Sequence, residues 1–319
     1  MLVRSRHARP DQEVSGTGLL VGFGHVALRV ADVEACVRHA VTVMGLQEVE
    51  RRGTTAYLTH GSPHHSLQLI QAAGAAVDHV ALEAPDAAAF EELRRRLDAE
   101  AVEVVLEGDP SSLVEESVTF LGPDGFRFEV YLGMRQVSAP APGAGVRPRG
   151  GLRHVSLRVT DLARAVEFFT RVLDFRVSDL VGDVGAFLRC NPDHHGLALL
   201  AGDSRLHHHA WEVESVAELS RLCDLLDEVG VGTLWGPVRH GAGGNVACYH
   251  AEPGGTVVEY YADMERVYDE RRPIRRWSAG DQRWYSLWTP GVPTGFRERG
   301  LPPAATGFPS IGRTGGFGQ

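Results

Sequence analysis

The sequence predicts an α+β protein made of four βαβββ modules, two in each half of the chain, that form two open barrels. Three observations support this fold class. Segments recur along the chain at a distance of 129 to 130 residues, as from His25 to His154 and from Glu129 to Glu259. Each copy alternates strand-like and helix-like patterns, and the Pro/Gly-rich segment SAPAPGAGVRPRGG separates the copies. Five regions are expected: a tail at 1–20, a first domain at 21–137, a linker at 138–150, a second domain at 151–290 and a tail at 291–319.

Each copy begins with the pattern of a half-buried strand followed by a helix. HVSLRV, which starts at His154, places valine and leucine on one face and His154, Ser156 and Arg158 on the other. The next segment, LARAVEFFTRVL, has apolar residues at helical spacing, and Asp161 before it is a suitable N-cap. The first copy repeats the pattern in HVALRVADVEACVRHAV from His25. A strand and a helix are therefore predicted at the start of each domain.

The remaining repeated segments complete the modules. HHSLQLI from His64 returns as HHGLALL from His194, and GPDGFRFEVYL from Gly122 returns as EPGGTVVEYYA from Glu252. SVAELSRLCDLLDEVG predicts a helix that Ser215 caps. NVACYHAEPGGTVVEYY predicts a hairpin whose turn contains Pro-Gly-Gly. Each copy is thus expected to contain two βαβββ modules.

RLHHHAWEV places three consecutive histidines on a predicted strand. The repeat distance aligns His208 with His79 of the first copy. Because side chains alternate along a strand, His207 and His209 are expected on the opposite face from His208. That face corresponds to apolar positions such as Val80, so we expect it to pack against a helix or an edge. His208 is therefore the histidine predicted to be functional.

The repeat brings together two histidines and one carboxylate as a candidate metal site. His154, His208 and Glu259 each lie on a different predicted strand and face inward. A facial triad of this kind leaves three adjacent coordination positions open and suits Fe(II) or Mn(II). The alternative is that His154 is a hydrogen-bonded barrel histidine and Glu259 a solvated strand carboxylate.

The composition limits the chemistry of the 319-residue chain. All 32 basic residues are arginine, and the absence of lysine excludes Schiff-base and pyridoxal chemistry and any P-loop. The formal net charge of -9, without a basic stripe, argues against nucleic-acid binding. No apolar run approaches the roughly 20 residues of a membrane-spanning helix, and the N-terminus lacks the apolar core of a secretory signal. Four scattered cysteines without CxxC spacing favour a reduced, cytoplasmic protein.

The motifs RLHHxxxEV, GPxRHG and xxYxxxPxGxxxE, in this order and within a duplicated chain, resemble the type I extradiol catechol dioxygenases of the vicinal oxygen chelate superfamily. The resemblance to catechol 2,3-dioxygenases and homoprotocatechuate 2,3-dioxygenases runs from about Gly22 to Trp288. It implies extradiol (meta) cleavage of an aromatic diol with O2 at a 2-His-1-Glu Fe(II) site, with Mn(II) as the other candidate metal. It also implies a homo-oligomer whose first domain, 21–137, is non-catalytic and whose second domain, 151–290, is catalytic.

The resemblance carries specific roles onto residues of the second domain. The family's metal ligands fall on the three residues that the repeat selected. In CNPDHHGLAL, His195 takes the position of a histidine beside the oxygen site. In GPVRHG, His240 takes a substrate-side position, and in ACYHAEPGG, Tyr249 takes the position of a tyrosine that hydrogen-bonds the catechol oxygen. The alternative is that Tyr249 is a packed aromatic residue, His240 an ordinary loop residue and His195 a surface histidine.

The expected substrate contacts are Trp235, Arg239, Arg283 and Trp284. Homoprotocatechuate enzymes carry an arginine five residues before the substrate-side histidine, where this chain has Trp235. A second family arginine aligns with Trp284, although Arg283 is adjacent. Loss of a charge-assisted partner weakens binding of a carboxylate, so we expect a neutral, bulky catechol.

The sequence is compatible with several alternatives. The first copy also has His25, His79, Glu129 and His65, so a second metal site competes with a relic whose histidines hydrogen-bond within the barrel. That copy has Thr119 at the position of Tyr249. The superfamily also includes glyoxalase-type isomerases and lyases, which use four protein ligands, and non-catalytic drug-binding resistance proteins. The Gly/Pro-rich tail GLPPAATGFPSIGRTGGFGQ is expected to be loosely ordered.

Overall fold

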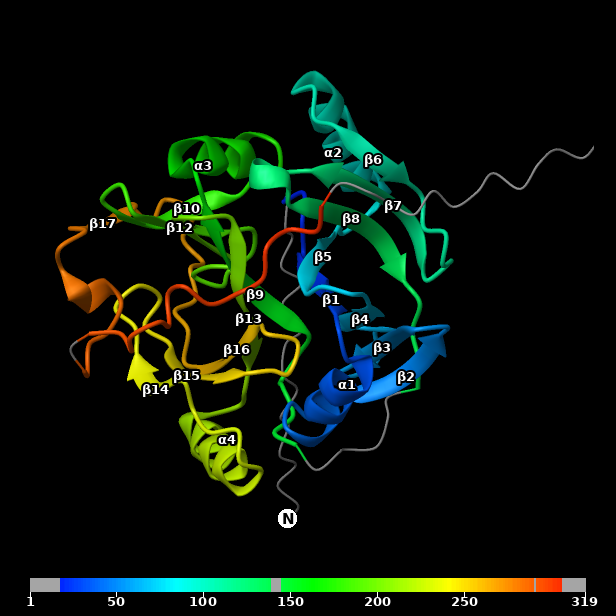
Figure 1. Cartoon of the computed structure of the whole chain (residues 1–319). Coiled ribbons are helices and arrows are strands. Elements are labelled where there is room, and N and C mark those ends of the chain that lie inside the picture. Colours follow the sequence, from blue (N-terminus) through cyan, green and yellow to red (C-terminus); the bar gives the residue numbers. More distant parts are fainter. Residues whose placement is uncertain (1–17, 139–144, 290, 306–319) are drawn as a thin grey trace, which may run out of the picture.

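The computed structural model describes residues 18–138, 145–289 and 291–305, which form two sheet-based halves (Figure 1). Most of the predicted N-terminal tail, the middle of the predicted linker and the end of the C-terminal tail lie outside the described residues. In the described chain, the order of strands and helices confirms the four predicted βαβββ modules. The repeat distance in the sequence therefore corresponds to a duplicated architecture.

The N-terminal half contains the first two modules. Its elements are β1 (Gly22–Val30), α1 (Val33–Thr42), β2 (Gln47–Arg52), β3 (Thr55–Thr59), β4 (Leu67–Gln71), β5 (Ala76–Glu83), α2 (Ala87–Ala99), β6 (Val104–Glu107), β7 (Val114–Leu121) and β8 (Arg127–Met134). Within residues 18–138 the strands form one eight-stranded sheet in the order β2-β3-β4-β1-β5-β8-β7-β6. The antiparallel pair β1 and β5 joins the two modules.

The C-terminal half repeats this arrangement. Its elements are β9 (Leu152–Val159), α3 (Leu162–Arg171), β10 (Arg176–Val181), β11 (Gly185–Arg189), β12 (Leu197–Ala201), β13 (Arg205–Glu212), α4 (Val216–Glu228), β14 (Trp235–Arg239), β15 (Val246–Ala251), β16 (Val257–Ala262) and β17 (Arg275–Trp277). Among its described residues the sheet order is β14-β15-β16-β13-β9-β12-β11-β10-β17. The antiparallel pair β13 and β9 joins the modules, and β17 is an addition at the edge.

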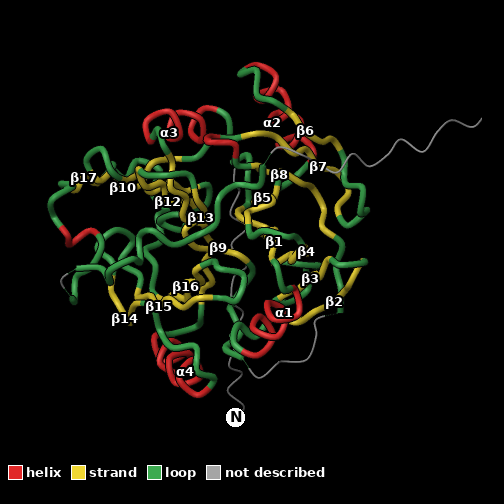
Figure 2. Tube along the Cα trace, in the orientation of Figure 1, coloured by secondary structure: helices red, strands yellow, loops and turns green. Residues whose placement is uncertain are grey.

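Strand β9 shows why the sequence folds in this way. Its valine and leucine side chains are buried in the hydrophobic core, whereas His154 and Ser156 line a cavity on the other face. Asp161 caps α3, because its carboxylate accepts a hydrogen bond from the backbone N–H of Arg164 at 3.0 Å. The helices lie on the outside of the sheets (Figure 2). The alternating strand pattern thus separates a packed face from a chemically useful one.

The two halves share one continuous hydrophobic core. The rings of Phe128 and Phe169 meet edge to face with centroids 5.2 Å apart, and Phe23 meets Phe175 at 6.3 Å. The hydroxyl of buried Tyr260 donates a hydrogen bond to the carbonyl of Met44 at 2.7 Å. Aromatic burial of this kind holds the two copies against each other.

The segment 291–305 packs across both halves. Leu301 bridges to Leu206 of β13, and Pro303 bridges to Val77 of β5. Gly300 has a φ of +113°, and a Cβ there would lie 2.2 Å from the carbonyl oxygen of Leu206, so glycine permits the close approach. The expectation of a loosely ordered tail is therefore wrong for residues 300–305, because backbone pairing orders a segment that lacks strand-like alternation. Residues 306–319 lie outside the described chain.

None of the helices in the described ranges combines the length and apolar character that crossing a membrane requires.

Candidate metal centre

Three adjacent strands of the C-terminal sheet bring His154, His208 and Glu259 together. In the strand pairing, Ala210 of β13 lies opposite both His154 of β9 and Glu259 of β16. His208 lies two residues before Ala210 and therefore shares its face. Glu259 Oε2 is 3.2 Å from His154 Nε2 and 3.0 Å from His208 Nε2. The three residues are far apart in the sequence, and the register of the sheet thus brings the predicted triad together.

The donor atoms of this triad fit a divalent transition metal. Neighbouring ligands of an octahedral ion with bonds of about 2.1 Å are separated by about 3 Å, close to the observed separations. All three residues are buried. Burial raises the pKa of the Glu259 carboxyl, but His154 and His208 outweigh this effect and hold the pKa well below its ordinary value. Two imidazoles and one carboxylate form the donor set expected for Fe(II) or Mn(II).

Hydrogen bonds from other residues orient two of the three candidate ligands. The carbonyl of Phe296 accepts a hydrogen bond from His207 Nε2 at 2.8 Å, which leaves His207 Nδ1 to accept one from His208 Nδ1 at 2.7 Å. His208 Nε2 is then free of its proton and able to bind a metal. Asn245 Nδ2 donates a hydrogen bond to Glu259 Oε1 at 3.0 Å, so that the other carboxylate oxygen, Oε2, faces the two histidines.

His207 contradicts the prediction that it lies on the packed face of the strand. A register shift between Leu206 and His208 marks a bulge in β13, and both His207 and His208 line the cavity. His209 follows the prediction: it is buried and accepts a hydrogen bond from Trp211 Nε1 at 2.8 Å. Strict alternation fails at His207 because the bulge rotates one side chain onto the other face.

A cavity of about 440 Å³ opens beside the triad. Its wall is largely apolar and aromatic, with Phe187, Ala198, Leu200, Trp284 and Tyr285. The three residues predicted to act on substrate and oxygen also line it: His195, His240 and Tyr249. A concave apolar site with a few convergent polar groups is typical of small-molecule binding.

Tyr249 and His240 form a polar pair whose protons can be assigned. The carbonyl of Tyr285 accepts a hydrogen bond from His240 Nδ1 at 2.5 Å. Burial lowers the pKa of His240, so its neutral ring has an unprotonated Nε2 that accepts from the Tyr249 hydroxyl at 2.7 Å. Burial also raises the pKa of Tyr249 well above its ordinary value. The pair therefore presents a neutral hydroxyl next to the candidate metal ligands.

His195 is the end of a second chain of polar groups. Its Nδ1 lies 3.0 Å from Nδ1 of His194, and His194 Nε2 lies 3.1 Å from Asp179 Oδ1. A carboxylate at Nε2 of His194 favours a tautomer in which His195 Nδ1 donates and its Nε2 stays an acceptor. Burial, followed by the nearby His154, lowers the pKa of His195 well below its ordinary value. His195 is therefore a neutral proton acceptor in the cavity.

The four predicted substrate contacts lie at different distances from the cavity. Trp284 lines the cavity. Trp235 lies one layer behind, with its ring stacked on Tyr249 at a centroid distance of 5.5 Å. Arg239 donates to the carbonyl of Gly244 at 2.6 Å and is absent from the described cavity wall, as is Arg283. The structure thus brings one of the four directly to the cavity.

Sequence reasoning missed several residues of the site. Asn245, Tyr285 and Phe187 line the cavity, and Phe296 reaches His207 from the C-terminal segment. The repeat gave no signal for Asn245, because it belongs to a loop that differs between the copies. It gave none for Phe296 either, because the C-terminal segment has no counterpart in the first copy. Tyr285 was within reach of prediction, since it directly follows Trp284.

Comparisons with known proteins agree with this geometry. A family model described as the Glyoxalase/Bleomycin resistance protein/Dioxygenase superfamily matches residues 22–130 and 151–260. A manganese-dependent 2,3-dihydroxybiphenyl 1,2-dioxygenase of Geobacillus genomosp. 3 is 25% identical, over 85% of this chain and 94% of the relative. A 3-methylcatechol 2,3-dioxygenase of Pseudomonas putida is 28% identical, over 83% and 96%. The crystal structure of a Mn(II)-bound glyoxalase from Novosphingobium aromaticivorans superimposes with a TM-score of 0.79 at 29% identity, covering 86% and 92% of the two chains.

Proposed function

Because the chain belongs to the glyoxalase/bleomycin resistance protein/dioxygenase superfamily, we propose that it is an extradiol ring-cleaving dioxygenase. The observation that carries this proposal is the joint placement of the triad, the Tyr249–His240 pair and His195 around one apolar cavity. The dioxygenase relatives that span most of the chain support the same activity. The reaction inserts both atoms of O2 into a catechol and opens the ring beside the diol.

His154, His208 and Glu259 would hold Fe(II), or Mn(II), in the C-terminal half. When bound, the ion supplies Lewis acidity toward the diol oxygens and a redox partner for dioxygen. The relative that is manganese-dependent supports Mn(II) as an alternative to iron. The described part of the chain supplies three protein ligands at this site. Such a set leaves room for both reactants, which favours oxygenation over a site closed by four ligands.

The remaining residues handle protons and position the diol. The Tyr249 hydroxyl, held by His240 at 2.7 Å, can hydrogen-bond a diol oxygen as that oxygen loses its proton. Neutral His195 can accept a proton at Nε2 and return it to the opened product. The apolar wall keeps water away from these groups and strengthens their hydrogen bonds.

The cavity favours a neutral and bulky catechol. Its wall is largely apolar where the substrate ring would lie. Behind Tyr249, Trp235 stands at the position where the homoprotocatechuate enzymes carry an arginine. A neighbouring cavity of about 720 Å³ shares Leu200, His207, Trp284 and Tyr285 with the first. Arg158, Arg297 and Glu298 line its other side, so a second ring of the substrate would lie against the shared residues Leu200, Trp284 and Tyr285. The dihydroxybiphenyl relative agrees with a substituent of this kind.

Anaerobic loading with Fe(II), followed by addition of a catechol and air, tests the proposed activity. We expect uptake of one O2 per catechol, measured with an oxygen electrode, and a yellow ring-opened product. Protein without metal is the control. Failure of both the Fe(II)- and Mn(II)-loaded protein to consume O2 would reject the proposal, and turnover of methylglyoxal with glutathione would favour a glyoxalase-type isomerase.

Substrate preference is tested by comparing 3-alkylcatechols and 2,3-dihydroxybiphenyl with homoprotocatechuate. We expect kcat/KM to be at least about tenfold higher for the neutral diols, because an unpaired carboxylate in the apolar cavity costs roughly 1–3 kcal/mol. A higher kcat/KM for the carboxylated catechol would contradict the proposed substrate class while leaving the ring-cleaving activity intact.

A further inference from the structure

The N-terminal half contains a second group of metal-ligating side chains. His25 of β1, His79 of β5 and Glu129 of β8 converge on the inner face of the eight-stranded sheet. Ala81 lies opposite both His25 and Glu129, as Ala210 does in the other half. We propose that these three residues bind a second divalent transition-metal ion, whose open side faces a cavity with polar side chains that can hydrogen-bond a small oxygen-bearing ligand.

The donor separations are those of one face of a coordination sphere. His25 Nε2 is 2.9 Å from His79 Nε2, and each of these atoms is 3.4 Å from Glu129 Oε2. Neighbouring ligands of an octahedral ion are expected about 3 Å apart. His25 is buried, and the side chains of His79 and Glu129 are 16% and 12% exposed. The group is therefore shielded from water and still open on one side.

A carboxylate fixes the orientation of His79. Asp78 Oδ1 accepts a hydrogen bond from His79 Nδ1 at 2.9 Å, which directs Nε2 of the same ring toward His25 and Glu129. Arg29 holds Asp78 in turn, with Nε 2.7 Å from Oδ2. Metal-binding histidines commonly donate their other N–H to a carboxylate in this manner. One of the three candidate ligands, His79, therefore has the outer hydrogen bond that is typical of a metal site.

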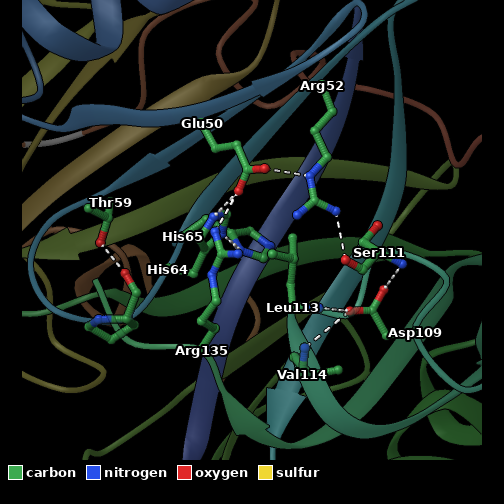
Figure 3. Close-up of polar contacts among 11 residues, drawn as sticks. Glu50, Arg52, Thr59, His64, His65, Asp109, Ser111, Leu113, Val114 and Arg135 are labelled. Atoms are coloured by element: carbon green, nitrogen blue, oxygen red, sulfur yellow. Dashed lines mark hydrogen bonds and ion pairs between the residues drawn. The ribbon is translucent and has the colours of Figure 1, made fainter. Parts of the chain in front are cut away.

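A chain of polar contacts also fixes His65, which lies beside His25 with ring centroids 4.2 Å apart. Glu50 Oε2 accepts from His64 Nε2 at 2.8 Å, and His64 Nδ1 lies 3.1 Å from His65 Nδ1 (Figure 3). Arg52 donates to Glu50 at 2.6 Å and to the carbonyl of Ser111 at 2.6 Å. One glutamate thus supports both a cavity histidine and the loop that forms the cavity wall.

The cavity above this group differs in chemistry from the one in the C-terminal half. It measures about 760 Å³, and its wall includes the polar side chains of Gln68, Asp109, Ser111, Thr119 and Arg127. The Asp109 carboxylate accepts hydrogen bonds from the backbone N–H groups of the same loop, including Ser111 at 2.7 Å (Figure 3). Leu106, Leu113 and Val114 also line this cavity, so its wall is mixed. Its hydroxyl, amide and charged groups can hydrogen-bond water or a small oxygen donor, which the mainly apolar wall of the other cavity offers less.

A competing account is a network of hydrogen bonds without metal, in which a protonated histidine takes the place of the ion. Burial lowers the pKa of His79, but hydrogen bonds to Asp78 and Glu129 outweigh this effect and raise it to about 10. A bound metal would have to displace that proton. Only a direct count of bound ions distinguishes the two accounts.

The experiment counts Mn(II) ions bound to the full chain. Protein stripped with a chelator is loaded anaerobically with Mn(II), desalted and measured for metal per chain by mass spectrometry. We expect two ions in the wild type, one in Glu129→Ala, one in Glu259→Ala and close to none in the double variant. His60→Ala, a histidine of the N-terminal half outside the group, is the matched control and should retain two.

The design separates this proposal from the proposed function. If the wild type binds one ion and Glu259→Ala loses it, the second site is overturned. If the wild type binds one ion and only Glu129→Ala loses it, the second site is supported and the C-terminal centre is contradicted. Glu129→Gln replaces Glu129→Ala if the latter fails to fold. As an independent measurement, Mn(II) should raise the Tm of Glu259→Ala but not that of the double variant.

Discussion

The two halves share one scaffold and differ in what surrounds the inward-facing triad. In the C-terminal cavity Tyr249 lies opposite Glu259 in the strand pairing, and in the N-terminal cavity Thr119 lies opposite Glu129. The histidine of β13 is oriented by His207, whereas that of β5 is oriented by a carboxylate. The sheet register preserves the donor positions, and the loops and neighbouring side chains decide which ligand can enter. In this fold the residues around the triad, more than the triad itself, therefore determine the function.

The largest expected difference between the halves is in ring cleavage. Glu259→Ala removes the negative ligand of the proposed catalytic centre and should lower kcat/KM at least about a thousandfold, which is over 4 kcal/mol of lost transition-state stabilisation. Glu129→Ala, the equivalent change in the other half, should lower it by less than tenfold. Steady-state O2 uptake on protein of verified fold is the measurement. Comparable losses in the two variants would show that the activity does not belong to the C-terminal half.

A smaller effect is expected from the residue that distinguishes the two cavities. Tyr249→Phe keeps the ring stacked on Trp235 but removes the hydroxyl that donates a hydrogen bond to His240 Nε2. The loss of one positioned proton-transfer group should lower kcat about a hundredfold, with a smaller change in KM. The pH profile of kcat should also change, which a purely structural role would not cause. Tyr268→Phe, which removes an exposed hydroxyl away from the described cavity wall, serves as the control.

The hairpin turns provide the smallest expected difference. Glu252 stands where the first copy has Gly122, and burial raises its pKa from 4.5 to about 7. Since the folded state then binds a proton that the unfolded state has released, stability should fall as the pH rises from about 4.5 to about 7. Glu252→Gln should therefore increase the free energy of unfolding by about 1–3 kcal/mol at pH 8 and change it little at pH 4.5.

Urea denaturation at the two pH values measures this difference, with Glu228→Gln on the exposed end of α4 as the control. An equal stabilisation of Glu252→Gln at both pH values would show that the buried carboxyl does not titrate as described.

The repeat made much of the fold and the triad predictable. Alternation in HVSLRV and the equivalence of Glu129 with Glu259 depend on local pattern and chain distance, which a sequence contains directly. The bulge that turns His207 into the cavity has no such pattern, because it follows from how β13 pairs with its neighbours. The order of residues 300–305 could not be predicted either, since it depends on pairing with residues that are distant in the sequence, such as Leu206 and Val77.

The C-terminal segment that crosses both halves has a practical consequence. The carbonyl of Phe296 accepts a hydrogen bond from His207 in one cavity wall, and the carbonyl of Ala305 accepts one from Arg127 in the other. A proteolytic nick within this stretch would disturb both walls at once and blur any kinetic contrast between them. The intact mass of each preparation should therefore be measured whenever an effect is assigned to one half.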